Sequence, residues 1–535
     1  MIRNKRVLLI CKESFSFPLF FLAKKLLQNG NEVGAFFIHP EEGYYNKCYY
    51  NENTYYNFKD NLVDVKLYGL KDLCEEFNEN YLNSKIDLSY LEYIEKNYCH
   101  FKNLNLQLAA SQLATRHFHS RFFLSHSTFE QHQIFLELGY KKVISVLDDY
   151  MPDVLMDSED GELLRNIINE VAYKRNIPYI NIDYPRVDGF KIPTYCLGVK
   201  KEEYLSAEYK RYYAMSKNEL DREYEYVENF RSSSSIMPKE FRGTITSQYK
   251  PDALFLVFKT SISILIYFLN VFIFSGNWKL RKRKQIIYTN PIKHYLFYLI
   301  VAAKRQLLYG KNIYFDSPKI GEAYVYMPLH LIPESTTFVK APFYINELHI
   351  IEQVSKSLPI GWYLYVKEHQ AMVGERELSF YKAVKKFPNV RLVKFNYYSD
   401  PKPWIQNAKG VIAVSGTGAY EAAMLGKKSI VFADVPFTLI EGVHHVSSFQ
   451  ELPSLIASFG SIDNIKSCAS YMAAVKSTGK DINLKYLITE GESIIRKDSV
   501  MNAKFQNGID ELADFYSDAY MAYPKRVQKF GRNEK

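Results

Sequence analysis

Short apolar runs alternate with helical patterns at the start of the chain. Residues 7–11 form an apolar run, residues 17–27 have apolar positions at helical spacing, and residues 33–38 form a second apolar run. Gly30 lies where the helix is expected to end. A strand, a helix and a strand at this spacing predict two parallel strands joined by a crossover, and therefore an α/β domain.

The alternation continues in the rest of the first half. Residues 142–147 predict a strand that ends at two aspartates, residues 163–174 predict a helix, and residues 178–182 predict another strand. The stretch before them, about residues 40–125, is rich in Tyr and Asn and is predicted to be mostly helical.

A second α/β pattern begins at residue 323. Helical segments separate five short apolar or β-branched runs, which are residues 323–327, 363–367, 390–394, 410–415 and 429–432. Strands that alternate with helices at this spacing predict a doubly wound parallel sheet. The tail, roughly residues 484–525, has a polar helical pattern. We therefore expect an α/β protein with two Rossmann-like domains.

The most apolar stretch, residues 253–274, lies between the two halves, and the basic run Lys-Leu-Arg-Lys-Arg-Lys follows at residues 279–284. A spanning helix needs about 20 mostly apolar residues, so this stretch is marginal. An apolar helix beside a basic cluster favours attachment to the surface of an anionic membrane, because burial and charge attraction act together. A helix buried in the protein and a true membrane span are the alternatives. Residues 294–308 predict a second, amphipathic helix.

Composition narrows the class of protein. Of 535 residues, 47% are hydrophobic and 24% are charged, which excludes a disordered or fibrous chain. The formal net charge of +9 suits anionic ligands or an acidic membrane surface, but it is too small and too spread out to indicate nucleic acid.

The cysteines and the N-terminus favour the cytoplasm. The six cysteines have no paired or zinc-like spacing, which argues against a disulfide framework and a structural metal site. The first apolar run ends at Lys12, short of the roughly 7–15 apolar residues of an export signal. We interpret it as a buried strand.

The most informative segment is residues 411–427, a predicted strand that runs into Ser415, Gly416, Thr417 and Gly418 and then into a helix. Such a turn presents backbone N–H groups at a helix N-terminus, which favours phosphate. Glu421, one turn further on, could hold ribose hydroxyls. The alternative is an ordinary helix cap made by Ser415 or Thr417.

Two other predicted strands end in polar residues. Lys367 and His369 follow the strand at 363–367 and could neutralise a phosphate leaving group, with His369 as a proton donor. Glu334, Ser335 and Thr336 follow the first strand of this half. Ligands of open α/β sheets bind beyond the carboxyl ends of the strands, so these residues are expected to share one crevice with the Ser415 turn. A surface histidine and a plain proline-bounded loop are the alternatives.

Three motifs of the second half resemble those of bacterial capsule and surface-polysaccharide glycosyltransferases, including Kdo-transferase-like enzymes of GT-B architecture. They are Pro-Leu-His-x-x-Pro-Glu-x-Thr-Thr (328–337), Leu-Pro-x-Gly-Trp-x-Leu-Tyr-Val-Lys-Glu-His (358–369) and Val-Ser-Gly-Thr-Gly-x-x-Glu-Ala-x-x-x-Gly-Lys (414–427). The resemblance covers about residues 320–440. In the first half it extends only to architecture.

The resemblance implies that the second domain holds a nucleotide sugar and the first domain binds the acceptor. In related CMP-sugar transferases a histidine-proline motif and a serine-rich turn bind the cytidine phosphate. His369 matches the motif histidine, and Ser415 and Thr417 match the turn. Gln370 stands where proline is usual.

The same enzymes carry an acidic motif in the first domain whose carboxylate deprotonates the acceptor. Asp148 and Asp149 are the candidates here, although Tyr150 replaces the usual glycine and Asp153 and Asp157 lie nearby. Glu13, just past the first strand, is the next candidate base. Arg186 is a candidate to bind an anionic acceptor or a donor carboxylate.

We therefore expect a transferase that moves a sugar from a nucleotide donor, CMP-linked in preference to UDP-linked, to a growing capsule or lipopolysaccharide glycan or glycolipid. No metal ion or cofactor is expected to be required. A nucleotide-sugar epimerase of the same architecture is one alternative. A non-catalytic scaffold of a polysaccharide assembly complex is another.

The expected parts are an acceptor domain (1–230), a helical membrane-associating segment (231–320), a nucleotide-sugar-binding domain (321–483) and helices that cross back to the first domain (484–535). We expect a cytoplasmic protein, peripheral on the cytoplasmic face of the inner membrane.

Overall fold

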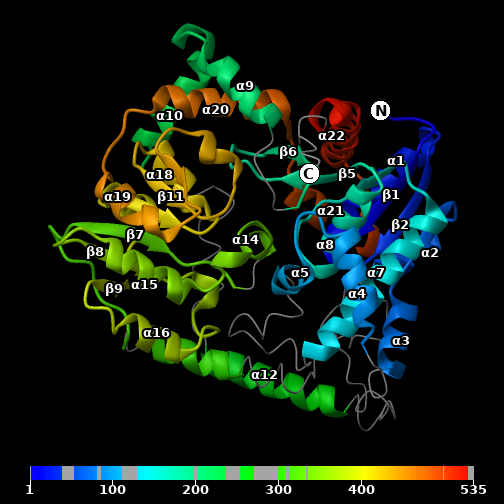
Figure 1. Cartoon of the computed structure of the whole chain (residues 1–535), viewed down its shortest axis with the longest axis horizontal. Helices are drawn as coiled ribbons and strands as arrows, with labels where there is room; N and C mark the ends of the chain where they lie inside the picture. Colours follow the sequence, from blue (N-terminus) through cyan, green and yellow to red (C-terminus); the bar gives the residue numbers. More distant parts are fainter. Residues whose placement is uncertain are drawn as a thin grey trace.

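The structure is a computed structural model in which the residues that can be described are 2–38, 54–80, 86–110, 129–197, 203–236, 253–269, 299–308, 313–332, 335–497 and 499–527. Two sheets, one mainly parallel and one parallel throughout, organise the molecule, one in each half of Figure 1. The fold is therefore α/β with two Rossmann-like domains, as predicted, in a GT-B-like arrangement.

The first sheet has seven strands in the order β13-β6-β5-β4-β1-β2-β3. Strands β1 to β5 run parallel, whereas β6 is antiparallel to both of its neighbours. The strands are β1 (Arg6–Cys11), β2 (Glu32–Phe37), β3 (Val65–Tyr68), β4 (Val154–Met156), β5 (Tyr179–Asp183), β6 (Phe190–Thr194) and β13 (Lys480–Asp481).

Helices cover both faces of this sheet because β1 alternates its buried side chains. Leu8 and Ile10 pack toward α7 and α8, whereas Val7 and Leu9 pack toward α1 and the C-terminal helices. The helices of this half are α1 (Ser16–Gln28), α2 (Tyr55–Asn61), α3 (Lys71–Asn80), α4 (Leu88–Asn97), α5 (Leu104–Ala110), α7 (Phe129–Tyr150), α8 (Leu163–Lys174), α21 (Leu484–Lys497) and α22 (Ala503–Val527).

The second sheet has six parallel strands in the order β12-β11-β10-β7-β8-β9. They are β7 (Tyr324–Pro328), β8 (Tyr363–Lys367), β9 (Val390–Val393), β10 (Gly410–Ala413), β11 (Ser429–Val431) and β12 (Val443–His445). The five strands predicted in this half are therefore confirmed. Strands β7, β8 and β10 are neighbours, so the three motifs leave the sheet at one edge.

The helices that belong with this sheet enclose one large apolar core. They are α9 (Glu203–Tyr213), α10 (Asp221–Ser232), α14 (Ser335–Lys340), α15 (Glu347–Ser357), α16 (Leu378–Val384), α17 (Lys402–Gln406), α18 (Thr417–Met424), α19 (Leu452–Ala457) and α20 (Ile465–Thr478). Helices α9 and α10 pack against α20, as Figure 1 shows, although they precede the second sheet in the chain.

The C-terminal helices return to the first domain. Helices α21 and α22 both pack on α1. The Tyr516 hydroxyl donates to the Asp157 carbonyl oxygen (2.6 Å), and the backbone N–H of Ile2 donates to Ser517 Oγ (3.2 Å). The tail therefore closes the first domain around its own N-terminus.

The predicted strand at 142–147 is wrong, because these residues lie inside helix α7. Their buried apolar side chains are Val143, Val146, Leu147 and Tyr150, which are spaced three and four residues apart. That spacing places all four on one helix face.

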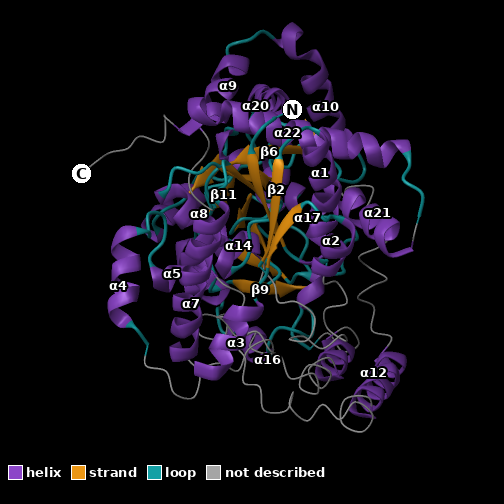
Figure 2. Ribbon diagram, turned by 90° about the vertical axis from the view of Figure 1, so that its right-hand side faces the viewer, coloured by secondary structure: helices purple, strands orange, loops and turns teal. Residues whose placement is uncertain are grey.

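Helix α12 (Ala253–Phe268) lies at the margin of the molecule in both Figure 1 and Figure 2. It begins at the start of the apolar stretch identified in the sequence, and the stretch beyond residue 269 lies outside the described residues. In the part of the chain that the structure describes, no helix is long and apolar enough to cross a membrane.

Candidate functional site

The three motifs of the second half converge at the carboxyl ends of β7, β8 and β10. His330 follows β7, and its Nε2 accepts a hydrogen bond from the backbone N–H of Ser415, which follows β10 (3.4 Å). Thr337 Oγ1 and Ser415 Oγ lie 3.1 Å apart. His369 follows β8, the strand that pairs with β7. The segments before α14 and after β8 and β10 therefore form one site.

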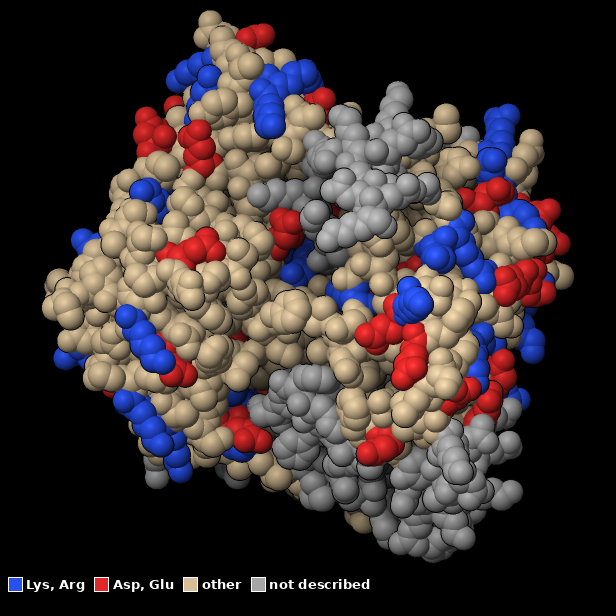
Figure 3. All heavy atoms as spheres, viewed as in Figure 1, with Lys and Arg blue, Asp and Glu red and all other residues tan. Residues whose placement is uncertain are grey.

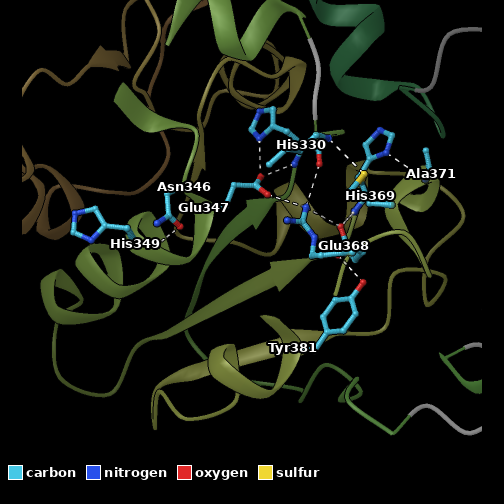
Figure 4. Close-up of polar contacts among 11 residues, drawn as sticks. His330, Asn346, Glu347, His349, Glu368, His369, Ala371 and Tyr381 are labelled. Atoms are coloured by element: carbon cyan, nitrogen blue, oxygen red, sulfur yellow. Dashed lines mark hydrogen bonds and ion pairs between the residues drawn. The ribbon is translucent and has the colours of Figure 1, made fainter. Parts of the chain in front are cut away.

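A buried ionic network lies beneath this edge and holds it together (Figure 4). Arg376 pairs with Glu347 (Nη2–Oε2 2.8 Å) and with Glu368 (Nε–Oε2 2.7 Å). Tyr381 donates its hydroxyl proton to Glu368 Oε2 (2.8 Å), and Glu368 Oε1 accepts from the backbone N–H of His369 (2.8 Å). The network thus fixes the backbone that carries His369.

The same network orients His330. The His330 ring Nδ1 lies 3.2 Å from Glu347 Oε1, which also accepts the His330 backbone N–H (2.7 Å). Burial disfavours the charged form of Glu347, but Arg376 and the bond from His330 outweigh it and lower the pKa of Glu347. An ionised Glu347 favours the proton on Nδ1, which leaves Nε2 free to accept from Ser415.

His369 is a neutral hydrogen-bonding group at neutral pH. The surrounding protein partly desolvates the ring and, together with the nearby charge of Lys367, lowers its pKa. The backbone N–H of Ala371 donates to Nδ1 (3.3 Å), so the neutral ring carries its proton on Nε2. The His369 side chain is exposed to solvent. It can therefore offer a hydrogen bond to a ligand.

The Ser415 turn lacks the ordinary cap that was its alternative interpretation. Helix α18 begins at Thr417 with Gly416 as the N-cap, and no side chain caps it. A β-carbon on Gly416 would lie 2.9 Å from His330 Nε2, so only glycine fits beneath that ring. The unpaired N–H groups of the first turn are available to an anion. Gly418 lies in the same turn, where a β-carbon would meet Pro328 at 3.1 Å.

Lys367 and Glu421 complete this half of the site. Both side chains are half-buried. Desolvation lowers the pKa of Lys367, opposed by Glu421 and Glu368. Desolvation also raises the pKa of Glu421 to about 7, opposed by Arg186 and Lys367. Glu421 therefore changes its charge near neutral pH.

Three predicted site residues are described only in part or not at all. Glu334 is outside the described residues. Ser335 and Thr336 start helix α14, but the positions of their side chains are not described. Their motif is represented in the site by His330 and Thr337.

The first domain presents its own strand ends to this site. Lys340 of α14 pairs with Asp183 at the end of β5, and its Nζ lies 3.9 Å from Asp160 Oδ2 beyond β4. Arg186, also beyond β5, acts electrostatically on Glu421. Figure 3 shows basic and acidic side chains in the hollow between the two halves. Charged groups from both domains therefore line one interdomain cleft.

Glu13 lies on the same edge of the first sheet. It opens the 3-10 turn after β1 and has a φ of 47°, a conformation that non-glycine residues rarely adopt. Burial raises the pKa of Glu13, reinforced by Glu159 and Glu162 and opposed by Lys12 and Arg165. A carboxylate with a raised pKa suits proton abstraction near neutral pH.

Asp148 and Asp149 do not lie on this edge, which corrects the prediction that they follow a strand. They occupy the last turn of α7, before β4, near the amino ends of the strands. Asp148 pairs with Arg175 (2.8 Å), and Asp149 pairs with Lys66 (2.7 Å). The geometry no longer supports either residue as the general base, because the base is expected at the carboxyl ends of the strands.

The two other aspartates considered for the general base, Asp153 and Asp157, make contacts that support the fold. Asp153 accepts the backbone N–H of Arg6 (2.8 Å), also near the amino edge. Asp157 is fully buried, 2.7 Å from Arg165 Nε, and it accepts the Tyr179 hydroxyl (2.7 Å). Glu13 is therefore the candidate base that the geometry retains.

No known protein family matches the chain, and no curated protein matches its sequence significantly. Among solved structures, the Thermosulfurimonas dismutans KpsC beta Kdo 2,7 transferase is 9% identical, with 62% of this chain and 79% of that chain covered and a TM-score of 0.28. The Methanocaldococcus jannaschii UDP-GlcNAc 2-epimerase in complex with UDP-GlcNAc and UDP is 11% identical, with 87% and 97% covered and a TM-score of 0.26.

A third similar structure is the Rickettsia bellii UDP-N-acetylglucosamine 2-epimerase, at 11% identity, 92% and 99% coverage and a TM-score of 0.26. At these identities and TM-scores the similarities assign neither a family nor an activity. The roles of individual residues rest on the geometry of this chain.

Sequence reasoning missed the residues that support the site. Glu347 and Arg376 lie outside the strand ends, and each alone has the pattern of an ordinary surface charge. Lys340 belongs to a helix of one domain and is paired with an aspartate of the other. His330 stands in the first motif, between Pro328 and Glu334, and that position was the available signal.

The described residues contain no group of three or more His, Cys, Asp or Glu that could hold a metal ion. Lys367 and Arg186 both act electrostatically on Glu421.

Proposed function

We propose that this protein is a glycosyltransferase that moves a sugar from a nucleotide donor to an acceptor hydroxyl in the interdomain cleft. The observation that carries the proposal is the meeting of His330, His369 and the Ser415 turn at one strand edge. This edge presents uncapped helix N–H groups, a ring N–H and a lysine. These groups suit the phosphate of an activated sugar.

In the proposed reaction the acceptor oxygen attacks the anomeric carbon of the donor sugar. Glu13 takes the acceptor proton as the new C–O bond forms. The bond between the anomeric carbon and the phosphate oxygen breaks, and the nucleotide leaves with the electron pair. Lys367, the His369 Nε2–H and the first turn of α18 stabilise the charge on the leaving phosphate. Glu421 holds the ribose hydroxyls.

The proposed donor is a CMP-linked sugar such as Kdo or another ulosonic acid, in preference to a UDP-linked sugar. This choice rests on the resemblance of residues 328–337, 358–369 and 414–427 to the capsule and lipopolysaccharide transferases. The proposed acceptor is a glycan or glycolipid, and Arg186 would bind an anionic group of the donor or of the acceptor.

A thermal-shift panel of CMP, UDP and GDP tests the donor site, because a ligand that binds the folded state raises its apparent stability. We expect CMP to raise the melting temperature most. A larger shift with UDP would reassign the donor class, and no shift with any nucleotide would contradict the proposal.

A turnover assay separates transfer from the epimerase alternative. CMP-sugar and a capsule or lipopolysaccharide acceptor should give product and free CMP in equal amounts. Interconversion of a nucleotide sugar without acceptor would identify an epimerase. Nucleotide binding without either reaction would favour the scaffold.

A further inference from the structure

Helix α12 exposes a stripe of large apolar side chains. Phe255, Phe258, Ile262, Leu265 and Ile266 are 63%, 65%, 40%, 57% and 51% exposed. Their spacing of three, four, three and one residues places them on a single face of the helix, within about 100° of arc, whereas Val257, 36% exposed, lies outside this arc. In a soluble helix such a stripe normally faces the core.

Nothing in the described part of the molecule covers this stripe. No described helix or strand packs extensively on α12. In Figure 1 the helix runs along the lower margin beneath both halves, and in Figure 2 it again lies at the edge, away from the sheets. An exposed apolar face of this size marks an interaction surface.

Helix α12 can lie on a membrane surface. Its 16 described residues extend about 24 Å at 1.5 Å per residue, and the chain beyond residue 269 lies outside the described residues. A helix that lies in the interface places an apolar face in the headgroup region, and the stripe supplies such a face.

The charged residues in the sequence of α12 and after it indicate which kind of partner the stripe binds. Helix α12 contains one charged residue, Lys259, and no acidic residue. The chain that follows carries five Lys or Arg among the six residues 279–284. A second copy of the same chain would bring the same cations to the contact and would be repelled. Anionic lipid headgroups complement them.

We infer that α12 docks the protein on the surface of an anionic membrane, with the stripe from Phe255 to Ile266 in the headgroup region. The inference rests on the exposed stripe and on the basic residues that follow it in the sequence, and it does not depend on what reaction the cleft performs. It also accounts for an apolar sequence that neither sheet uses.

The test measures co-sedimentation of the full chain with vesicles of phosphatidylcholine alone or of phosphatidylcholine and phosphatidylglycerol in equal parts. The stripe variant is Phe258→Ser, Ile262→Ser and Leu265→Ser together. The matched control is Val63→Ser, Ile320→Ser and Ile360→Ser, since these apolar residues are 90%, 107% and 102% exposed elsewhere on the surface. Melting temperature and light scattering follow the fold and the oligomeric state of each protein.

We expect the wild-type protein and the control to bind the anionic vesicles, and the stripe variant to lose binding about tenfold with an unchanged melting temperature. Binding to phosphatidylcholine alone should be weaker, and about 1 M salt should reduce binding to anionic vesicles, because the Debye length is then about 3 Å. Equal binding of wild-type and stripe variant, no binding of the wild-type protein, or a dimer that the stripe variant dissociates would each overturn the inference.

Discussion

The His369 side chain is the most direct contact that the proposed site offers to a leaving phosphate. We expect His369→Ala to lower the rate of transfer by about 10²–10³-fold, because one preorganised hydrogen-bond donor contributes about that much. Its exposed ring makes a loss of fold unexpected.

His349→Ala is the matched control for this variant, since His349 is an exposed histidine on α15 that points away from the site in Figure 4. Steady-state rates and melting temperatures of both variants check the prediction. Equal turnover of His369→Ala and wild-type protein would remove His369 from the mechanism.

The pH dependence of transfer tests Glu13. A general base works when it is deprotonated, and the pKa of Glu13 is raised by burial. Turnover should therefore rise with pH through a pKa above the usual glutamate value. Glu13→Gln should abolish turnover while CMP still raises the melting temperature. An unchanged pH profile in Glu13→Gln would exclude Glu13 as the base.

Glu421 should make the protein less stable as the pH rises. Its pKa is about 7 in the folded protein against 4.5 ordinarily, so its contribution to stability is present below about pH 4.5 and is lost as the pH rises through 7. The decrease in the free energy of unfolding should not exceed about 3 kcal/mol, since the side chain is half-buried. Chemical denaturation at pH 5 and about pH 8 measures it. Glu421→Gln should abolish this dependence, and a variant that keeps it would contradict the assignment.

At the scale of single elements, the turn between β10 and α18 should tolerate no side chain at Gly416. A β-carbon there meets His330 Nε2 at 2.9 Å, so Gly416→Ala must displace either the ring or the turn. We expect it to lower the free energy of unfolding by about 1–3 kcal/mol and to weaken CMP binding. Gly460→Ala is the control, because its β-carbon would meet nothing within 4 Å. Equal CMP affinity of both variants would contradict the role of the turn.

Most strands could be predicted because a continuous apolar run between polar or glycine residues indicates a buried strand from the local sequence alone, as in β1, β8 and β10. Helix α7 was missed because its β-branched run at 143–146 has the composition of a strand, and its helical spacing became visible only over a longer window. That single error moved Asp148 and Asp149 to the wrong edge of the sheet.

At the scale of the whole molecule, the cleft joins groups that are distant in sequence. Domain packing determines which cation faces which carboxylate across the cleft, as with Lys340 and Asp183. No local pattern in the sequence indicates such a pair. The strand ends could be named from the sequence as the candidate site, whereas the network of Arg376, Glu347 and Glu368 beneath them could not be predicted.

A double-mutant cycle tests that cross-domain pair. Lys340→Met and Asp183→Asn should each lower the free energy of unfolding, because each leaves a half-buried charge without its nearest partner. The double variant should lose less than the sum of the two, by about 0.5–3 kcal/mol. Strictly additive losses would show that the two domains are not coupled through this contact.

The measurement that tests the central claim most directly is hydrogen–deuterium exchange of the full chain with and without CMP. The account predicts that CMP slows exchange together in three separated segments, around His330, around His369 and in the turn from Ser415 to Gly418. Protection elsewhere with these three segments unchanged, or no protection at all, would contradict it.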